Sequence, residues 1–197
     1  MFSRISKALL RLWGFKIEGR YPHEVKKMVI IVFPHTSNWD FPVGLLVRSA
    51  LKADIKYVGK SSLFRFPFGG LFRWLGGYPV DRSKNNNFVD AVIDILNKED
   101  CFAITLTPEG TRKKVTQLKT GFYYIADGAQ VPIVMVKFDW AKKIVGFSEP
   151  FYTTGDYDAD MIKVLSYYKG VKGYHPELGY NVNENGEMQG ALYTTAP

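Results

Sequence analysis

Three apolar runs constrain the fold of this chain more than any other feature of its sequence. They cover residues 28–33 (MVIIVF), 101–106 (CFAITL) and 131–138 (VPIVMVKF). A strand without polar alternation is buried on both faces, which is typical of parallel sheets covered by helices. Between the runs, apolar residues recur with helical spacing in residues 41–46 and 88–96. Strands that alternate with helices predict an α/β fold: a single domain with a mostly parallel central sheet flanked by helices.

The domain boundaries follow from length and patterning. The chain has 197 residues, which is the size of one domain with at most a small appendage. We expect a leading helix in residues 1–14, the folded domain in residues 15–180 and a polar tail in residues 181–197. Within the domain, residues 144–151 indicate a further strand and residues 160–169 a late helix.

The first thirteen residues predict an amphipathic helix. Its apolar face carries Phe2, Ile5, Leu9, Leu12 and Trp13, and three basic residues occupy the opposite face. Two interpretations are open: a helix that packs its apolar face into the core, or an interfacial helix with aromatic residues at the lipid boundary and basic residues near lipid phosphates.

Composition limits the partners and the chemistry. The longest stretch without a charged residue, 28–39, is too short to cross a membrane, and nothing resembles a cleavable signal peptide. The net charge of +7 favours an anionic partner, but the basic residues are scattered and no nucleic-acid-binding motif is present, so we exclude nucleic acid. One cysteine and three histidines leave little for a metal site. Cys101 lies in a predicted strand, so we expect a buried thiol rather than a nucleophile.

Polar residues follow the first apolar run, where sites gather in α/β sheets. His35 and Asp40 are five residues apart, which places them on different faces of a helix or strand. They meet only if the chain turns sharply between them, and Pro42 fits the first turn of a following helix. The carboxylate would then hold the imidazole in one tautomer and leave the other nitrogen as a base. The alternative is that Asp40 or Asn38 only caps the helix.

Two further segments carry arginines suited to phosphate. Residues 107–114 (TPEGTRKK) form a tight turn in which Gly110 allows close approach of a ligand and Arg112 offers a planar fork. Residues 76–82 (GGYPVDR) read as a short strand ending in Arg82. Either arginine could instead be an exposed charge on a surface turn. The sequence contains neither a dinucleotide-binding fingerprint nor a Walker loop.

Taken in order, these segments resemble the 1-acylglycerol-3-phosphate acyltransferase family, the HxxxxD glycerolipid acyltransferases. The four matching blocks are residues 35–40 (HTSNWD), 77–82 (GYPVDR), 108–112 (PEGTR) and 131–134 (VPIV), and residues 60–69 are also similar. The resemblance covers about residues 15 to 150. The chain departs from the family pattern at a few positions, none of which removes a catalytic group: Pro34, Thr107, Lys113 and Met135.

The resemblance implies acyl transfer from a fatty acyl thioester to an acceptor hydroxyl. His35 would be the general base and Asp40 would orient it. Arg82 and Arg112 would hold the phosphate of the acceptor. The implied substrate-binding residues are Lys60, Arg82, Glu109, Gly110, Thr111 and Arg112.

The resemblance also implies partners and a location. The donor would be acyl-CoA or acyl carrier protein, the acceptor a lysophospholipid, and no tightly bound cofactor or metal would be needed. Since the lipid lies in a phospholipid membrane, we expect a peripheral protein on the cytoplasmic face. Residues 64–75 are a second aromatic and basic segment, which would either contact lipid or form a buried aromatic cluster. The alternatives are another acceptor, such as a lyso-aminolipid, or a non-catalytic lipid-binding protein. The presence of both His35 and Asp40 argues against the second.

Overall fold

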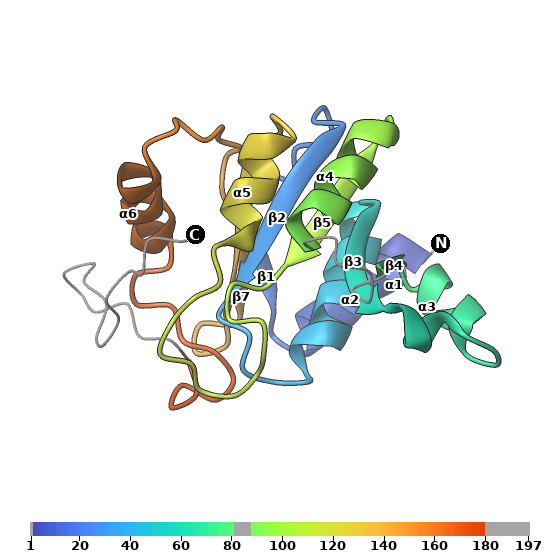
Figure 1. Cartoon of the computed structure of the whole chain (residues 1–197). Helices are drawn as coiled ribbons and strands as arrows, with labels where there is room; N and C mark the ends of the chain where they lie inside the picture. The colour runs from blue at the N-terminus through green and yellow to red at the C-terminus, as the bar shows by residue number, and fades with distance from the viewer. Residues whose placement is uncertain (1, 81–87, 180–197) are drawn as a thin grey trace.

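A seven-stranded sheet forms the centre of the molecule (Figure 1). The computed structural model describes residues 2–80 and 88–179. In spatial order, the strands are β1 (Lys16–Glu18), β7 (Ile144–Phe147), β6 (Ile133–Asp139), β2 (Lys27–Phe33), β5 (Phe102–Leu106), β3 (Ile55–Lys60) and β4 (Gly77–Val80). Neighbouring strands in this sheet are parallel except β6 and β7, which form an antiparallel hairpin. The predicted α/β fold with a mostly parallel sheet is confirmed.

Helices cover both faces of the sheet. On one face lie α1 (Phe2–Leu12) and α2 (Asp40–Leu51), and on the other lie α4 (Phe88–Lys98), α5 (Gly121–Gly128) and α6 (Tyr157–Tyr167). A short 3-10 helix, η1 (Ser61–Phe64), and α3 (Gly69–Trp74) follow β3 and lie at the β4 edge (Figure 1).

The central strand β2 explains why its sequence shows no alternation. Met28, Ile30 and Val32 pack into the hydrophobic cluster under α1 and α2. The residues between them, Val29 and Ile31, pack into the cluster under α4, α5 and α6 and are fully buried. Because successive side chains of a strand point to opposite faces, a strand between two cores needs an apolar residue at every position.

Two local expectations need correction. Cys101 is exposed and precedes β5, which begins at Phe102, because the ladder between β5 and β2 starts with the pair Lys27 and Phe102. The late helix begins at Tyr157, three residues earlier than expected, because the side chain of Asp156 caps it by accepting a hydrogen bond from the Ala159 N–H at 3.1 Å. The predicted tail, residues 181–197, lies outside the described residues.

Helix α1 packs onto the protein along a narrow seam that contains the buried side chain of Leu10 and two serines. It contacts α2 through small residues: Ser6 Oγ donates to Ser49 Oγ at 2.8 Å, and Ser3 Oγ donates to the Ala50 carbonyl at 2.8 Å. Its apolar face is exposed, with 84% of Leu12 and 77% of Phe2 accessible to solvent. The core-packing interpretation is therefore wrong for four of the five residues of this face, whereas Trp13 is partly buried and packs against the core.

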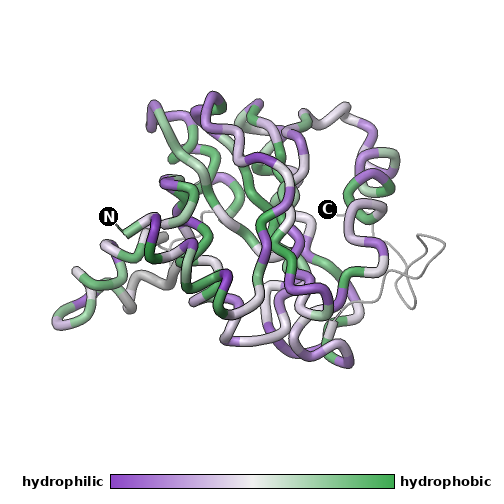
Figure 2. Tube along the Cα trace, turned by 180° about the vertical axis from the view of Figure 1, so that it is seen from behind, coloured by the Kyte–Doolittle hydropathy of each residue, from purple (hydrophilic) through white to green (hydrophobic). Residues whose placement is uncertain are grey.

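A second exposed apolar segment lies around α3. Phe66 is 97% exposed and Trp74 is 75% exposed. Figure 2 shows α1 and α3 at the same end of the molecule, opposite α6. Within residues 2–80 and 88–179, the helices lack the combined length and hydrophobicity of a membrane-crossing segment.

Candidate active site

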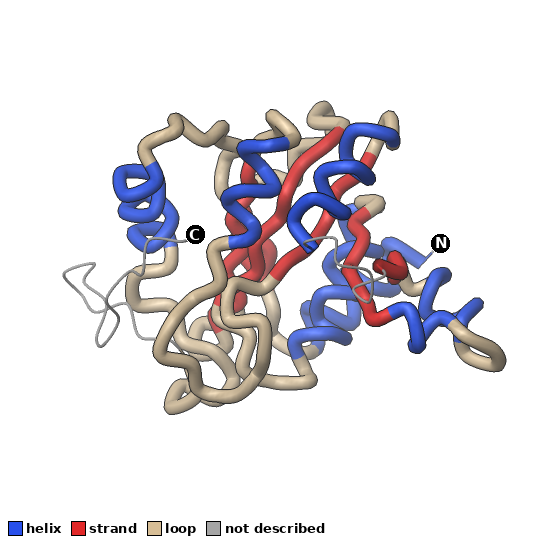
Figure 3. The backbone as a smooth tube through the Cα atoms, viewed as in Figure 1, coloured by secondary structure: helices blue, strands red, loops and turns tan. Residues whose placement is uncertain are grey.

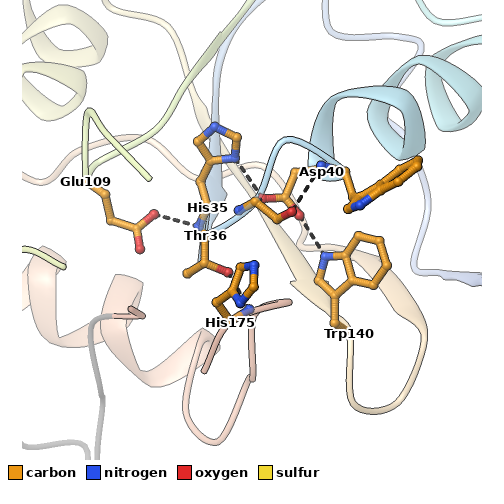
Figure 4. A network of polar contacts seen from close by, with 8 residues as sticks. His35, Thr36, Asp40, Glu109, Trp140 and His175 are labelled. Atoms are coloured by element: carbon orange, nitrogen blue, oxygen red, sulfur yellow. Dashed lines mark hydrogen bonds and ion pairs between the residues drawn. The ribbon is translucent and has the colours of Figure 1, made fainter. Parts of the chain in front are cut away.

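His35 and Asp40 meet at the carboxyl end of β2. The chain leaves β2 through a cis peptide bond between Phe33 and Pro34, turns through residues 36–39 and enters α2 at Asp40. This turn places Nδ1 of His35 2.9 Å from Oδ2 of Asp40 (Figure 4). Asp40 therefore does more than begin a helix, and the pairing that the sequence left open is present in the structure.

The carboxylate of Asp40 is surrounded by donors. Oδ2 also accepts from the Ser37 N–H at 3.1 Å, and Oδ1 accepts from Nε1 of Trp140 at 2.7 Å. The Asp40 side chain is 2% exposed, whereas that of His35 is 19% exposed. With the Nδ1 proton directed at Asp40, Nε2 of His35 carries the lone pair and is the nitrogen free to act as a base.

The loop after β5 is hydrogen-bonded to the turn that follows β2. Oε2 of buried Glu109 accepts a hydrogen bond from the His35 N–H at 2.6 Å. Because β2 and β5 are adjacent and parallel, the loops that follow them lie side by side at one edge of the sheet, the lower edge in Figure 3. The sequence segments 35–40 and 108–112 thus form one site through a direct contact.

Gly110 allows the loop after β5 to fold back on itself. It has a positive φ of 65°, and a Cβ there would lie 2.8 Å from Cε of Lys119. The Lys119 N–H donates to the Pro108 carbonyl at 2.7 Å, which closes the loop. Glycine is favoured because the backbone has a positive φ, and a side chain there would also have to displace the flexible end of Lys119.

A cavity of about 1300 Å³ opens at the His–Asp pair. One part of its lining is apolar and comes from α2 and from the sheet face under it: Gly44 on the helix, and Ile30, Val32, Val136, Phe138 and Phe147 on the strands. The other part is basic and polar and comes from the loop after β5 and the start of α5: Arg112, Gln117, Lys119 and Thr120. A cavity with these two parts suits an amphiphile with an anionic head.

The structure brings most of the predicted site residues together. His35 and Asp40 face each other, Glu109 contacts the His35 backbone, and Gly110 and Arg112 line the cavity. Thr111 is exposed in the same turn, where its Oγ1 accepts from the Lys113 N–H at 3.3 Å.

Two predicted residues are not placed. Arg82 lies outside the described residues, and Lys60 is described only as the last backbone position of β3, paired with Val80.

Sequence reasoning missed Trp140 and Lys119. Trp140 lies 100 residues from its partner Asp40, and no local pattern signals that contact. Lys119 precedes the glycine that opens α5, and only the fold of the loop brings it to the cavity. Among the described residues, no three His, Cys, Asp or Glu side chains gather closely enough to hold a metal ion.

A histidine hydrogen-bonded to a buried carboxylate, at the carboxyl ends of parallel strands, is an arrangement suited to activating a hydroxyl group or water. A family model described as Acyltransferase matches residues 14–138. This match covers more than half of the chain, and the chain therefore belongs to the acyltransferase family.

Known relatives agree with this family assignment, and a solved structure agrees with the fold. The chain is 29% identical to a 1-acyl-sn-glycerol-3-phosphate acyltransferase of Haemophilus influenzae over 181 residues, which is 81% of this chain and 73% of that protein. It is 30% identical to the Escherichia coli K12 enzyme of the same name over 144 residues, 69% of this chain and 56% of that protein. The crystal structure of the 1-acyl-sn-glycerophosphate (LPA) acyltransferase PlsC from Thermotoga maritima superposes with a TM-score of 0.57 at 15% identity. That superposition covers 84% of this chain and 74% of the other, and it supports the fold.

Proposed function

We propose that this chain transfers a fatty acyl group from an acyl thioester to the hydroxyl of a lysophospholipid, with 1-acylglycerol-3-phosphate as the preferred acceptor. The observation that carries the proposal is the His35–Asp40 hydrogen bond of 2.9 Å at the mouth of a cavity with an apolar and a basic part. The relatives named as 1-acyl-sn-glycerol-3-phosphate acyltransferases support the choice of acceptor.

The chemistry needs one base and no enzyme nucleophile. Nε2 of His35 takes the proton of the acceptor hydroxyl while the hydroxyl oxygen attacks the thioester carbonyl carbon. The carbon–sulfur bond then breaks, and the imidazolium returns the proton to the leaving thiolate. Asp40 stabilises the imidazolium between these two steps. Cys101 takes no part, because it precedes β5 and so lies at the opposite edge of the sheet from His35.

The basic part of the cavity is the proposed phosphate site. Arg112 and Lys119 belong to the loop between β5 and α5, which Glu109 holds to the backbone of His35. A guanidinium and an ammonium group bind a phosphate through charge-assisted hydrogen bonds. Lys60 and Arg82 are proposed to complete this site, while Gly110 and Thr111 shape the turn that presents Arg112.

The apolar part of the cavity is the proposed acyl-chain site. Gly44 on α2 faces Phe138 on β6, since a Cβ at Gly44 would lie 3.7 Å from Cζ of that ring. Gly44 and Phe138 both line the cavity, so a larger side chain at Gly44 would narrow it on the side that we assign to the hydrocarbon. The pantetheine part of acyl-CoA or of acyl carrier protein would remain at the mouth.

Residues 1–14 are proposed to hold the enzyme on the cytoplasmic face of a phospholipid membrane as a peripheral protein, with residues 15–180 as the catalytic domain. In α1 an exposed apolar face and a basic face flank the seam that docks on α2, an arrangement suited to an anionic interface. To test this, we would measure vesicle flotation of Leu12→Glu and Trp74→Glu on liposomes of phosphatidylglycerol and phosphatidylcholine. Each variant should bind at least about tenfold more weakly than wild type.

Ile162→Glu is the matched control for that experiment. Ile162 is 65% exposed, on α6, at the opposite end of the molecule from α1 and α3. The same charge placed there should leave flotation unchanged. Equal binding by all three variants and wild type would overturn the proposal that α1 and α3 contact the membrane.

The acceptor and donor are tested by measuring free-thiol release from palmitoyl-CoA and palmitoyl-acyl carrier protein. Each donor is offered with lysophosphatidic acid or a lyso-aminolipid. We expect release that depends on lysophosphatidic acid and is lost in His35→Ala. Release with only the lyso-aminolipid would change the acceptor and keep the chemistry. Acceptor-dependent release at the wild-type rate in His35→Ala would contradict the mechanism, and absence of release from folded, membrane-bound protein would favour a lipid-binding role.

A further inference from the structure

The carboxylate of Asp40 depends on a hydrogen bond from outside the HxxxxD segment. Its Oδ1 accepts from Nε1 of Trp140 at 2.7 Å, across a sequence separation of 100 residues (Figure 4). We propose that Trp140 is a positioning residue for the reaction: its indole N–H fixes the plane of the carboxylate so that Oδ2 stays aligned with His35. This inference rests on the proposed acyltransferase function.

The carboxylate needs such an anchor because its terminal torsion is soft. Rotation of an aspartate carboxylate about its last bond has a broad, roughly twofold energy profile. The bonds from His35 and the Ser37 N–H both go to Oδ2, so alone they fix one oxygen and leave the plane free to turn about it. The bond to Oδ1 fixes the second oxygen. Asp40 is 3% exposed, so little water can reach it and replace a lost donor.

Trp140 is itself held firmly. Its backbone N–H donates to the Lys172 carbonyl at 2.8 Å. Its ring lies edge-on to Phe15 at 4.9 Å and to Tyr174 at 4.8 Å between centroids, and Nζ of Lys143 lies 4.6 Å from its ring centroid. These contacts come from the segment after α1, the β6–β7 turn and the segment after α6. The indole therefore has a defined position against which the carboxylate is aligned.

Packing alone does not require an indole here. A phenylalanine would also make edge-on aromatic contacts, but it would offer no donor to Oδ1. The hydrogen bond is short, both of its residues are buried, and its acceptor is the carboxylate that we assign to the reaction. Trp140 also lies two residues beyond the segment that matches the family model, which ends at residue 138. The role is therefore assigned from the geometry of this chain.

The test removes the N–H and keeps the ring. We would replace Trp140 with phenylalanine and, by site-specific incorporation, with 3-benzothienyl-alanine, which has sulfur in place of the N–H. Tyr168→Phe is the matched control, because it also deletes one buried aromatic donor, the 2.8 Å bond to the Ile31 carbonyl, on the other face of the sheet. The assay is thiol release in mixed micelles at saturating donor and acceptor, with thermal unfolding as the measure of folding.

We expect kcat to fall about tenfold in both Trp140 variants, with KM values within about twofold of wild type, and to change by less than twofold in Tyr168→Phe. The second readout is the Nδ1 proton of His35 in ¹⁵N-histidine-labelled protein, assigned by its absence in His35→Gln. This proton should exchange faster with water in the Trp140 variants, and its exchange rate should be unchanged in Tyr168→Phe. An unchanged kcat or an unchanged proton signal in a folded benzothienyl variant would overturn the proposal. If wild type transfers no acyl group, the proposed function fails, and the proton signal alone then decides whether Trp140 positions the pair.

Discussion

Replacement of Asp40 with asparagine is the sharpest test of how the His–Asp pair works. The substitution keeps the shape of the side chain and turns one acceptor oxygen into a donor. If the amide NH₂ faces Trp140, two donors oppose each other where a 2.7 Å hydrogen bond now lies. If the NH₂ faces His35, the imidazole must accept on Nδ1 and carry its proton on Nε2, where the base needs a lone pair. Neither orientation preserves the network.

The expected loss follows from the charge that is removed. In the proposed mechanism His35 becomes an imidazolium beside the Asp40 carboxylate, with Nδ1 and Oδ2 2.9 Å apart. Two unit charges separated by about 4 Å interact by about 4 kcal/mol at an effective dielectric constant of about 20. Because about 1.4 kcal/mol corresponds to a factor of ten in rate, kcat should fall about a thousandfold.

The assay is thiol release at saturating substrates, with circular dichroism and thermal unfolding as the check on folding. Asp158→Asn is the control, since Asp158 is exposed on α6 and should retain wild-type kcat. A folded Asp40→Asn variant with kcat within tenfold of wild type would show that the negative charge beside His35 does not drive the reaction. The general-base mechanism would then need another base.

Three further predictions concern stability and specificity. Asp160→Ala should lower the free energy of unfolding by about 3 kcal/mol and Tm by about 10 °C, because it leaves buried donors such as the Tyr123 hydroxyl without an acceptor. Asp158→Ala is the control and should lower the free energy of unfolding by less than about 1 kcal/mol. Burial, helped by the hydrogen bond to Asp160, raises the pKa of Tyr123 to about 12, above its unfolded value near 10. The unfolded chain thus loses this proton first, and denaturation at about pH 9 and pH 11 should show the free energy of unfolding falling as pH rises. Gly44→Leu, facing Phe138, should lower the kcat/KM ratio of palmitoyl over decanoyl thioester about tenfold, and an unchanged ratio would place the acyl chain elsewhere.

The sequence was sufficient to predict the parts of the fold that have a strong local signal. The runs at 28–33, 101–106 and 131–138 correspond to β2, β5 and β6, because a strand between two cores has no room for polar residues. The helical spacing in residues 88–96 corresponds to α4. The short strand β1 (Lys16–Glu18) was not predicted, since three residues of mixed polarity carry no periodic signal.

The sequence predicted most residues of the candidate site and offered the pairing of His35 with Asp40, but it did not predict the contacts between distant segments. His35 was found by its position after an apolar run, and Glu109 by the resemblance of residues 108–112 to the family. The bond from the His35 backbone to the Glu109 carboxylate depends on the pairing of β2 with β5. The orientation of α1 was equally hidden. Periodicity tells which residues share a helical face and not which face is covered, and the docking seam uses serines such as Ser6, which carry no hydrophobic signal.

The long sequence separations within the site bear on how the protein is made. Asp40 bonds to Trp140 across 100 positions, and the Thr36 hydroxyl accepts from the His175 N–H across 139. A nascent chain therefore carries the HxxxxD segment well before it carries the groups that hydrogen-bond to that segment, and contacts between such distant residues form late in folding. We expect ribosome-bound chains to be inert toward thioesters until residue 175 is outside the ribosome, because only then can it contact Thr36.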